Sequence, residues 1–318
     1  MKKRPLGKTG INISEIAFGG VEIGMPYGIG VNSNDDMLPV NEAIKLLQEA
    51  LDLEINFFDT ARIYGESERI MGEAFRNRRQ EVVIATKCRH FLDKDGNLPP
   101  AQEIKPIIES SLHESLTALK SDYVDVFMLH QANAAILNHE EIAITFENLK
   151  KEGKIRATGA STQTFEETEL AIGQGIWDVI QLPFNMVDQR QKELFPKAYE
   201  KGIGLVIRSV LLKGLLSDRG KNLHPALADV EKHLARYDSL LKDESYPLST
   251  LAVKYVLSFP EISAALVGID SLSYLYQSID AADGRYLDEN KLKQAEKLAY
   301  PDPAFIDLPY WSKMNWLK

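Results

Sequence analysis

Four polar residues that can move protons stand at or just after the ends of three consecutive apolar runs. Asp59, Lys87 and His130 each end such a run, and Tyr64 follows Asp59 by five residues. Since adjacent strands of a sheet lie ~4.8 Å apart, side chains at the ends of neighbouring strands can reach one pocket. A carboxylate, an amine, a phenol and an imidazole gathered in this way suit general acid–base catalysis.

Each of the four residues also has a purely structural interpretation. A lysine that ends a strand usually extends its ammonium group into solvent, and a single histidine usually has its hydrogen bonds satisfied within the protein. A tyrosine after a strand usually packs against neighbouring apolar side chains. Their joint occurrence at the ends of three neighbouring runs is improbable by chance. The sequence therefore favours a functional cluster.

The elements that must position these residues form a repeating pattern. Short apolar runs rich in β-branched residues alternate with longer stretches of helical periodicity. We expect strands at Ile13–Gly20, Ile55–Thr60, Val82–Lys87, Val124–His130, Ile155–Ser161, Val179–Asn185, Ile203–Ser209 and Ile262–Gly268. We expect helices at Pro39–Glu54, Ser67–Arg78, Ala101–Lys120, His139–Glu152, Thr164–Gly173, Gln189–Lys201 and Leu248–Ser258, and a last one from Tyr274.

Eight strand–helix units predict an α/β fold with a parallel sheet, and eight is the number that closes a (β/α)8 TIM barrel. A doubly wound open sheet stays an alternative, although it gives no reason for eight units. Ser67 and Ser273 are the expected N-caps of their helices, and Gly202 is an expected C-terminal stop. Arg4-Pro5-Leu6, the turn Gly7–Gly10 and the chain from Ile11 onward predict a hairpin. No linker divides the chain, so residues 1–318 are expected to form one domain.

Three connections are longer than simple joints between elements. Val21–Leu38 is rich in Gly and Asn, and Leu211–Pro247 is long and polar. Both follow strands, which predicts long loops at the C-terminal face of the barrel, where active sites are built. The tail Pro301–Lys318 carries Trp311 and Trp316, which either cover the mouth of the site or seal a helix against the barrel wall.

Composition limits the partners. The 318 residues include 37 Lys and Arg against 46 Asp and Glu, a net charge of −9, which argues against nucleic acid as the main partner. A local basic pocket for a small phosphate ligand is compatible with that charge. The basic start of the chain leads into no apolar stretch, and no apolar run approaches the ~20 residues of a membrane span. These features predict no signal peptide, no membrane contact and a cytoplasmic location.

Several familiar site motifs are absent from the sequence. Cys88 is the single cysteine, so an intrachain disulfide and a CxxC site are excluded, and we interpret it as a packing residue. Neither His113 nor His139 starts an HExxH zinc motif, and no metal site is expected. No GxGxxG follows a strand, which excludes a Rossmann dinucleotide domain.

The residues around the polar cluster resemble the signature of the aldo-keto reductase family. The signature begins at Asp59-Thr60-Ala61-x-x-Tyr64-Gly65 and continues through Ser67-Glu68 and Gly72-Glu73-Ala74. The likeness extends through Ala85-Thr86-Lys87, Leu129-His130, Gly153-Lys154-Ile155-Arg156, Ser161 and Gln181-x-x-Phe184-Asn185, and covers nearly the whole chain. It implies a (β/α)8 barrel that uses NADP(H) to reduce carbonyls.

The resemblance also implies a role for each member of the cluster. Tyr64 is expected to protonate the carbonyl oxygen as general acid, while the Lys87 ammonium lowers the pKa of the phenol. Asp59 is expected to keep Lys87 charged. His130 is expected to be neutral and to orient the substrate carbonyl.

The resemblance assigns a second set of residues to the cofactor. These are Gly20, Val21, Ser161, Gln181, Arg208, Ser209, Leu211, Lys213, Gly268, Asp270, Tyr274 and Gln277. Ser161 and Gln181 are expected to hold the nicotinamide carboxamide, and amides near Ser209 and Leu211 the pyrophosphate.

Three departures from the family pattern affect the cofactor prediction. Thr162 stands where the family often has Asn, and Arg208 where an aromatic residue usually stacks on the nicotinamide. The stretch Gly268–Ser278 contains no Lys or Arg for a 2′-phosphate, so Arg208 or Lys213 would have to reach it. We therefore expect NADP(H) more than NAD(H), with a smaller preference than is usual in the family.

Two other functions stay open at this stage. Lys87 ends a barrel strand, as the Schiff-base lysine of a lyase does, although Asp59 would keep it charged. A non-catalytic module that senses a cofactor could use the same barrel. For the reductase, we expect a small carbonyl or sugar-like substrate, with pocket walls from Tyr27, Arg62, His90, Phe91 and the tail. The sequence leaves the oligomeric state open.

Overall fold

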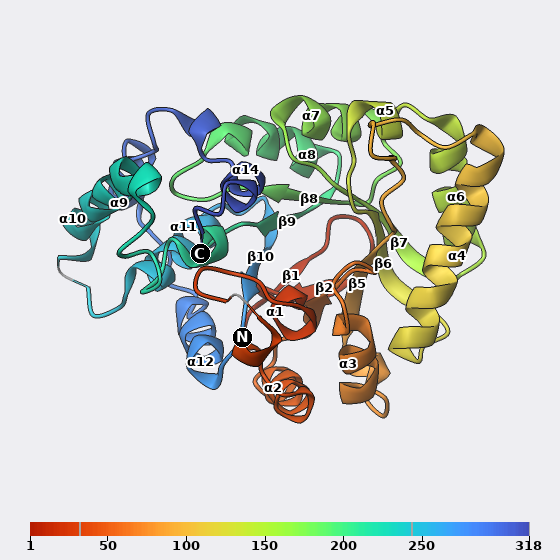
Figure 1. Cartoon of the computed structure of the whole chain (residues 1–318), viewed down its shortest axis with the longest axis horizontal. Coiled ribbons are helices and arrows are strands. Elements are labelled where there is room, and N and C mark those ends of the chain that lie inside the picture. The colour runs from red at the N-terminus through yellow and green to blue at the C-terminus, as the bar shows by residue number, and fades with distance from the viewer. Residues whose placement is uncertain (32, 243, 318) are drawn as a thin grey trace.

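A closed barrel of parallel strands occupies the centre of the molecule (Figure 1). The structure is a computed structural model that describes residues 1–31, 33–242 and 244–317. Asn32, Asp243 and Lys318, which fall in the three long connections expected from the sequence, lie outside the described residues. Around the barrel the strands follow the order β10-β3-β4-β5-β6-β7-β8-β9. Their bounds are β3 Ile16–Gly19, β4 Phe57–Asp59, β5 Val83–Lys87, β6 Val124–Leu129, β7 Ile155–Ser161, β8 Val179–Pro183, β9 Gly204–Arg208 and β10 Ile262–Gly268. The predicted (β/α)8 barrel is confirmed.

Alternation along each strand explains why site residues face the inside of the barrel. Successive side chains of a strand point to opposite faces, so every second residue enters the interior. In β5 the interior positions are Val83 and Ala85, which pack in the apolar centre, and then Lys87. In β4 they are Phe57 and then Asp59. On the other strands, the same two-residue spacing continues from the interior apolar residues to His130, Ser161, Gln181, Arg208 and Gly268, which therefore also face the interior.

Helices surround the strands, with α4 and α6 on the right of Figure 1 and α9 and α10 on the left. The helices are α1 Val21–Gly24, α2 Val40–Asp52, α3 Ser67–Ala74, α4 Ala101–Leu119, α5 Ala134–Leu137, α6 Glu140–Lys151, α7 Phe165–Gln174, α8 Phe195–Glu200, α9 Ala228–Leu234, α10 Asp238–Leu241, α11 Leu248–Leu257, α12 Leu272–Ala281, α13 Glu289–Glu296 and α14 Leu308–Lys313. Among the described residues, none of the helices is both long and apolar enough to cross a membrane.

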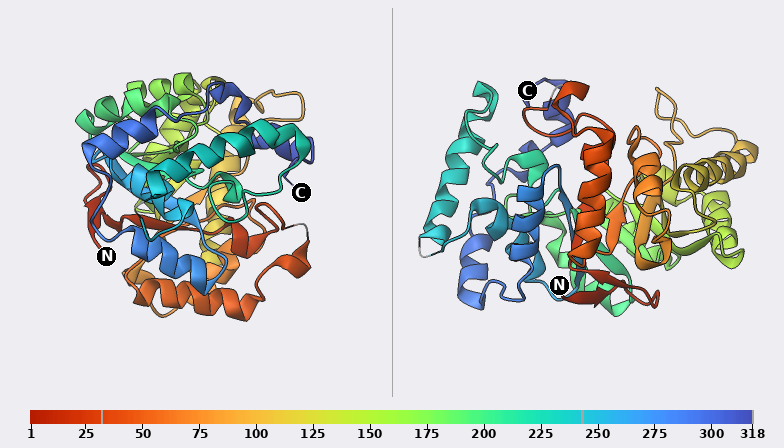
Figure 2. Two further views of the ribbon diagram at one scale, coloured as in Figure 1. Left: turned by 90° about the vertical axis from the view of Figure 1, so that its left-hand side faces the viewer. Right: turned by 90° about the horizontal axis from the view of Figure 1, so that it is seen from below.

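The hairpin expected before the barrel is present. Strand β1 (Lys3–Pro5) pairs antiparallel with β2 (Asn12–Ser14), and Leu6, Ile11 and Ile13 pack into the apolar centre of the barrel. The right-hand view of Figure 2 shows the N-terminus at one end of the barrel and the C-terminus at the other. The hairpin therefore closes the end of the barrel opposite the long loops.

Two predicted N-caps are wrong for local reasons. Helix α3 begins at Ser67 itself, and the Ser67 hydroxyl accepts a hydrogen bond from Thr60 Oγ1 at 2.8 Å instead of capping the helix. Helix α12 begins earlier than expected, and its cap is Ser271, whose hydroxyl accepts from the Tyr274 amide at 3.2 Å. The stop at Gly202 is confirmed, since this glycine has a φ of 70° directly after the helix region.

The remaining differences concern the longer segments. The helix expected over Gln189–Lys201 is divided into a 3₁₀ helix (η3, Arg190–Leu194) and α8, which has Pro196 in its first turn. The connection expected as one long polar loop, Leu211–Pro247, contains α9 and α10. The tail forms α14, in which Trp311 is fully buried against Phe305.

Candidate active site

A pocket opens at the C-terminal ends of the barrel strands. Its cavity volume is about 420 Å³, and its wall contains Asp59, Tyr64 and His130. It also contains every residue that the sequence assigned to the cofactor: Gly20, Val21, Ser161, Gln181, Arg208, Ser209, Leu211, Lys213, Gly268, Asp270, Tyr274 and Gln277. The structure thus gathers these predicted site residues in one place. Lys87 lies behind the wall, with 1% of its side chain exposed.

Asp59 is the centre of a buried hydrogen-bond network. Its Oδ2 accepts from Lys87 Nζ at 2.5 Å, and its Oδ1 accepts from Gln181 Nε2 at 2.8 Å. Lys87 Nζ also donates to the Thr60 carbonyl at 2.9 Å. Both carboxylate oxygens and the ammonium are thus partnered, which a buried ion pair needs in order to offset its loss of hydration. The contact between Gln181 and Asp59 was not expected from the sequence.

Tyr64 lies over this pair and beside His130. Lys87 Nζ is 4.9 Å from the centroid of the Tyr64 ring. The Tyr64 ring meets His130 edge-on at a centroid distance of 5.4 Å, and the His90 ring also meets His130 edge-on, at 4.9 Å. His130 Nδ1 is buried without a hydrogen-bond partner among the described residues. The phenol, the imidazole and the ion pair therefore form one compact group.

Close backbone contacts fix the loop that carries Tyr64. Gly65 has a φ of 51°, and a Cβ at Gly24 would come within 2.0 Å of the Tyr64 carbonyl oxygen, so a side chain at Gly24 would push the two loops apart. Further along, the buried Glu68 carboxylate accepts from Thr86 Oγ1 at 2.6 Å and pairs with Arg62. These contacts connect the loop after β4 to strand β5.

Burial sets the protonation of the group. The pKa of Tyr64 is raised, chiefly by burial and then by the negative charge of Asp59. The sequence predicted the opposite direction. The Lys87 charge is compensated by Asp59 at 2.5 Å, and burial lowers the pKa of Lys87. Burial, followed by the Lys87 charge, lowers the pKa of His130 to about 2, so its imidazole is neutral as predicted.

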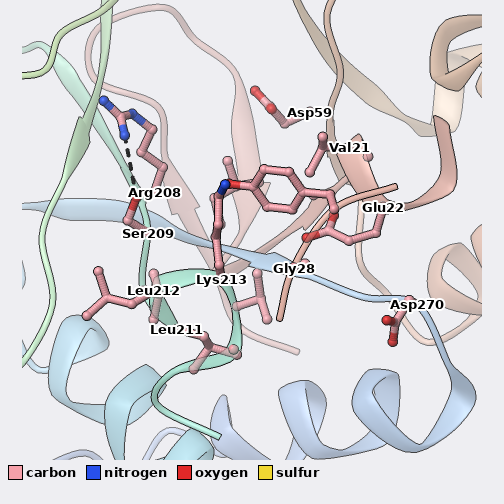
Figure 3. Close-up of a pocket in the computed structure, with 18 of the residues that line it drawn as sticks. Val21, Glu22, Gly28, Asp59, Arg208, Ser209, Leu211, Leu212, Lys213 and Asp270 are labelled. Carbon is pink, nitrogen blue, oxygen red and sulfur yellow. Dashed lines mark hydrogen bonds between the residues drawn. The ribbon is translucent and has the colours of Figure 1, made fainter. Parts of the chain in front are cut away.

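The other half of the pocket is formed by the end of β9 and the loop after it. Ser209 has a φ of 59°, which is unusual for a residue with a side chain, and this turn directs the chain along the pocket wall. Arg208 Nη2 donates to the Thr162 carbonyl at 2.8 Å and to Gln163 Oε1 at 2.6 Å. The Thr162 hydroxyl is turned to Thr168, 2.6 Å away. Figure 3 shows Arg208 and Ser209 on one side of the pocket and Asp270 on the other, with Glu22 between them.

The cation that pairs with a residue of 268–278 is Arg219, whereas the sequence predicted Arg208 or Lys213. Lys213 Nζ donates to Ser312 Oγ at 2.8 Å and lies 4.7 Å from the Tyr27 ring centroid, so it bridges the first loop and the tail. Arg219 instead pairs with Asp270 at 2.8 Å. Its position in the long loop after β9 gave no sequence signal for this contact.

Glu22 is another wall residue that was not predicted from the sequence. Its Oε2 is buried with no hydrogen-bond partner among the described residues, and burial raises its pKa to about 8. Its place directly after Gly20 and Val21, at the end of a barrel strand, could have indicated a pocket position.

The predicted substrate walls are partly correct. Tyr27 and His90 line the pocket, and the tail contributes Pro309. Arg62 is instead paired with Glu68, and Phe91 is buried in the outer apolar core. Trp311 seals α14 against Phe305, so the tail covers the mouth through Pro309 and Ser312 and not through this tryptophan.

The fold and the pocket define a (β/α)8-barrel protein with its site at the C-terminal face. Residues 15–299 match the Aldo/keto reductase family, and the chain belongs to that family. Aldo-keto reductases use nicotinamide cofactors, and the family and its relatives support an oxidoreductase.

Three similar proteins illustrate the relationship. L-galactose dehydrogenase of Arabidopsis thaliana is 30% identical over 316 residues, which cover 94% of this chain and 94% of that protein. The NADH-specific methylglyoxal reductase of Escherichia coli (strain K12) is 31% identical over 284 residues, 84% of this chain and 86% of that protein. The holo form of aldo-keto reductase AKR11C1 from Bacillus halodurans is 27% identical with a TM-score of 0.80, covering 94% of this chain and 96% of that one.

Proposed function

We propose that the protein is an NAD(P)H-dependent reductase that converts an aldehyde or ketone into an alcohol. The observation that carries this proposal is the position of Tyr64. Its phenol group lies with neutral His130 and the Asp59–Lys87 pair at the inner end of a pocket whose remaining wall suits a dinucleotide.

The residues of the wall fit a nicotinamide dinucleotide. The pocket runs from Ser161 and Gln181, which offer a hydroxyl and an amide, past the turn at Ser209 and Leu211 to the start of α12. Amide and hydroxyl donors suit a carboxamide and a pyrophosphate, and the N-terminus of a helix favours polar and anionic groups. When bound, the cofactor would supply the hydride that reduces the carbonyl carbon.

Tyr64 is proposed as the proton donor. Because burial and the charge of Asp59 raise its pKa, the phenol stays protonated at neutral pH, which is the form that reduction requires. An alkoxide is a stronger base than a phenolate, so proton transfer from Tyr64 to the developing alkoxide is favourable even with a raised phenol pKa. A positioned donor of this type contributes roughly 10²–10⁴-fold to the rate.

Lys87 and Asp59 are proposed to position Tyr64 and to stabilise its phenolate. The Lys87 ammonium lies 4.9 Å from the ring centroid and offers a positive charge that becomes important once the proton has left. Asp59 holds the ammonium in place through the 2.5 Å contact. His130 is proposed to donate its single N–H to the carbonyl oxygen, since its pKa of about 2 keeps it neutral.

The proposed substrate is a small carbonyl or sugar-like compound. Besides the residues assigned to the cofactor, the pocket is lined by polar groups such as His90, Gln131 and Gln163, with Ile63 and Pro309 as apolar contacts. L-galactose dehydrogenase and methylglyoxal reductase, named among the relatives, act on compounds of this size. A cytoplasmic location stays a prediction.

The two other functions have less support. A Schiff-base lysine must be neutral and must meet the substrate, whereas Lys87 Nζ is engaged by Asp59 and the Thr60 carbonyl and is buried behind the wall. A non-catalytic, cofactor-sensing module does not require the grouping of Tyr64 and His130. One relative at 27% identity is a probable voltage-gated potassium channel subunit beta of Arabidopsis thaliana, so turnover must be measured.

The direct test is oxidation of NADH and of NADPH in the presence of a panel of aldehydes, ketones and sugars. We expect turnover with at least one substrate and its loss in Tyr64→Phe, with cofactor fluorescence titrations showing that both proteins still bind. Cofactor binding without turnover across the panel would favour the sensing module. Trapping of a substrate adduct on Lys87 by borohydride would favour the lyase.

A further inference from the structure

A second cavity adjoins the pocket on its β10 side, and its wall is acidic. Its volume is about 420 Å³, and it shares Glu22, Arg219 and Asp270 with the main pocket. We call it the acidic lobe. The carboxyl groups that line it are those of Glu22, Asp36, Asp218 and Asp270. Among its described lining residues, Arg219 is the one cation.

The charge of Arg219 is already used within the lobe. Its Nη2 donates to Asp270 Oδ2 at 2.8 Å, and the guanidinium carbon lies 5.2 Å from the ring centroid of Tyr274. The Tyr274 hydroxyl in turn donates to Asp218 Oδ1 at 3.0 Å. These contacts hold the Asp270 carboxylate at the entrance to α12, where one oxygen is bound by Arg219 and the other can accept further hydrogen bonds.

Glu22 indicates that a ligand belongs beside this arrangement. A Cβ at Gly268 would lie 2.0 Å from Glu22 Oε1, so the carboxyl group rests directly on the backbone at the end of β10. Its Oε2 is buried without a hydrogen-bond partner among the described residues, and Glu22 is a wall residue of both cavities. A buried polar oxygen of this kind costs free energy until it is partnered. A ligand with hydroxyl groups would supply the missing contact.

The charges of the acidic lobe bear differently on two forms of an adenosine ribose, with and without a 2′-phosphate. A 2′-phosphate brings about two negative charges into a wall whose described residues, even with Glu22 protonated, include the carboxylates of Asp218 and Asp270 beside the guanidinium of Arg219. Like charges at such distances disfavour binding. A 2′,3′-diol is neutral and offers two O–H donors, which carboxylate oxygens accept in charge-assisted hydrogen bonds.

We propose that Asp270, held by Arg219, accepts hydrogen bonds from the 2′- and 3′-hydroxyls of the adenosine ribose, and that the acidic lobe selects NAD(H) over NADP(H). This inference rests on the proposed function, since it assumes that a nicotinamide dinucleotide occupies the main pocket. It reverses the preference for NADP(H) that was expected from the sequence. The sequence assigned Asp270 to the cofactor but did not associate Glu22, Asp36 and Asp218 with it. Arg219 alone would favour the phosphate, but its pairing with Asp270 cancels that charge.

The test compares dissociation constants, measured by quenching of protein fluorescence at one low salt concentration. The probes are NADH, NADPH, and the fragments ADP and 2′-phospho-ADP, which lack nicotinamide. We expect NADH and ADP to bind at least about tenfold more tightly than their 2′-phosphorylated forms, the effect of one charge-assisted hydrogen bond. Asp270→Asn should weaken NADH by about tenfold and strengthen NADPH, so that the ratio falls to about one or reverses.

The matched control is Asp280→Asn, an equal change of charge at an exposed position of α12, the helix that follows Asp270. It should leave both constants within about twofold of the wild type. Equal or tighter binding of NADPH by the wild type would overturn the inference and leave the proposed function intact, as would an unchanged ratio in Asp270→Asn. Binding of neither dinucleotide would instead overturn the proposed function, and the inference with it.

Discussion

Replacing Glu22 by Gln should change how the stability of the protein depends on pH. The Glu22 carboxyl lies against Gly268, and one of its oxygens is buried with no hydrogen-bond partner in the part of the chain that the structure describes. Burial raises its pKa from the usual 4.5 to about 8. The nearby negative charge of Asp270 adds to this rise, and Arg219 opposes it. Gln has the same shape and hydrogen-bonding reach but no ionisation. The variant therefore isolates the cost of the charge.

The sign and the size follow from proton linkage. Between about pH 4.5 and 8 the folded state holds a proton on Glu22 that the unfolded state has lost, so the free energy of unfolding falls as pH rises through this interval. The contribution is fully present below about 4.5 and lost above about 8. At ~1.4 kcal/mol per pKa unit the upper bound is ~5 kcal/mol. Since the group borders the open pocket, solvent screens part of it, and we expect about 2–3 kcal/mol.

The assay is thermal unfolding of the wild type and of Glu22→Gln over this range of pH. For a chain of 318 residues, about 2–3 kcal/mol corresponds to a Tm difference of about 4 °C. The variant should match the wild type at the acidic end and exceed it by that amount at the alkaline end. Glu200→Gln, a change at an exposed carboxyl group of α8, serves as the control and should follow the wild type. Parallel curves for the wild type and Glu22→Gln would refute the reasoning.

Three further predictions concern the catalytic group. Tyr64→Phe should lower kcat by about 10²–10⁴-fold and change cofactor affinity by less than about threefold; steady-state rates near those of the wild type would exclude Tyr64 as the acid. Lys87→Met should lose comparable activity and about 3–5 kcal/mol of stability in urea titrations, since it leaves Asp59 buried without its cation. Because the pKa of His130 is held at about 2 and that of Tyr64 is raised, kcat for reduction at saturating substrate should be flat over about pH 6–8; a sigmoid drop near the usual histidine pKa would contradict a neutral His130.

The sequence predicted the barrel and its central group because both depend on short-range patterns. Strand alternation places Lys87 two residues beyond Ala85 and therefore inside the barrel, and this can be inferred without coordinates. The raised pKa of Tyr64 was missed, since it depends on how completely the surrounding loops remove water. Arg219 was missed because its pairing with Asp270 depends on the course of a long loop, which no local pattern specifies.

The two-residue alternation of the barrel strands also has a consequence for how such a protein can diverge. Removal of one residue within β5 (Val83–Lys87) would shift the inward series by one place and turn Lys87 toward the helices, leaving Asp59 without its cation. Insertions in the loops after β3 or β9 would not change which strand residues face the interior, but they would alter the pocket wall near Tyr27 or Arg219. Mutation can therefore change what the pocket accepts by small length changes in loops, whereas the proton-transfer group survives only in lineages whose strands keep their length.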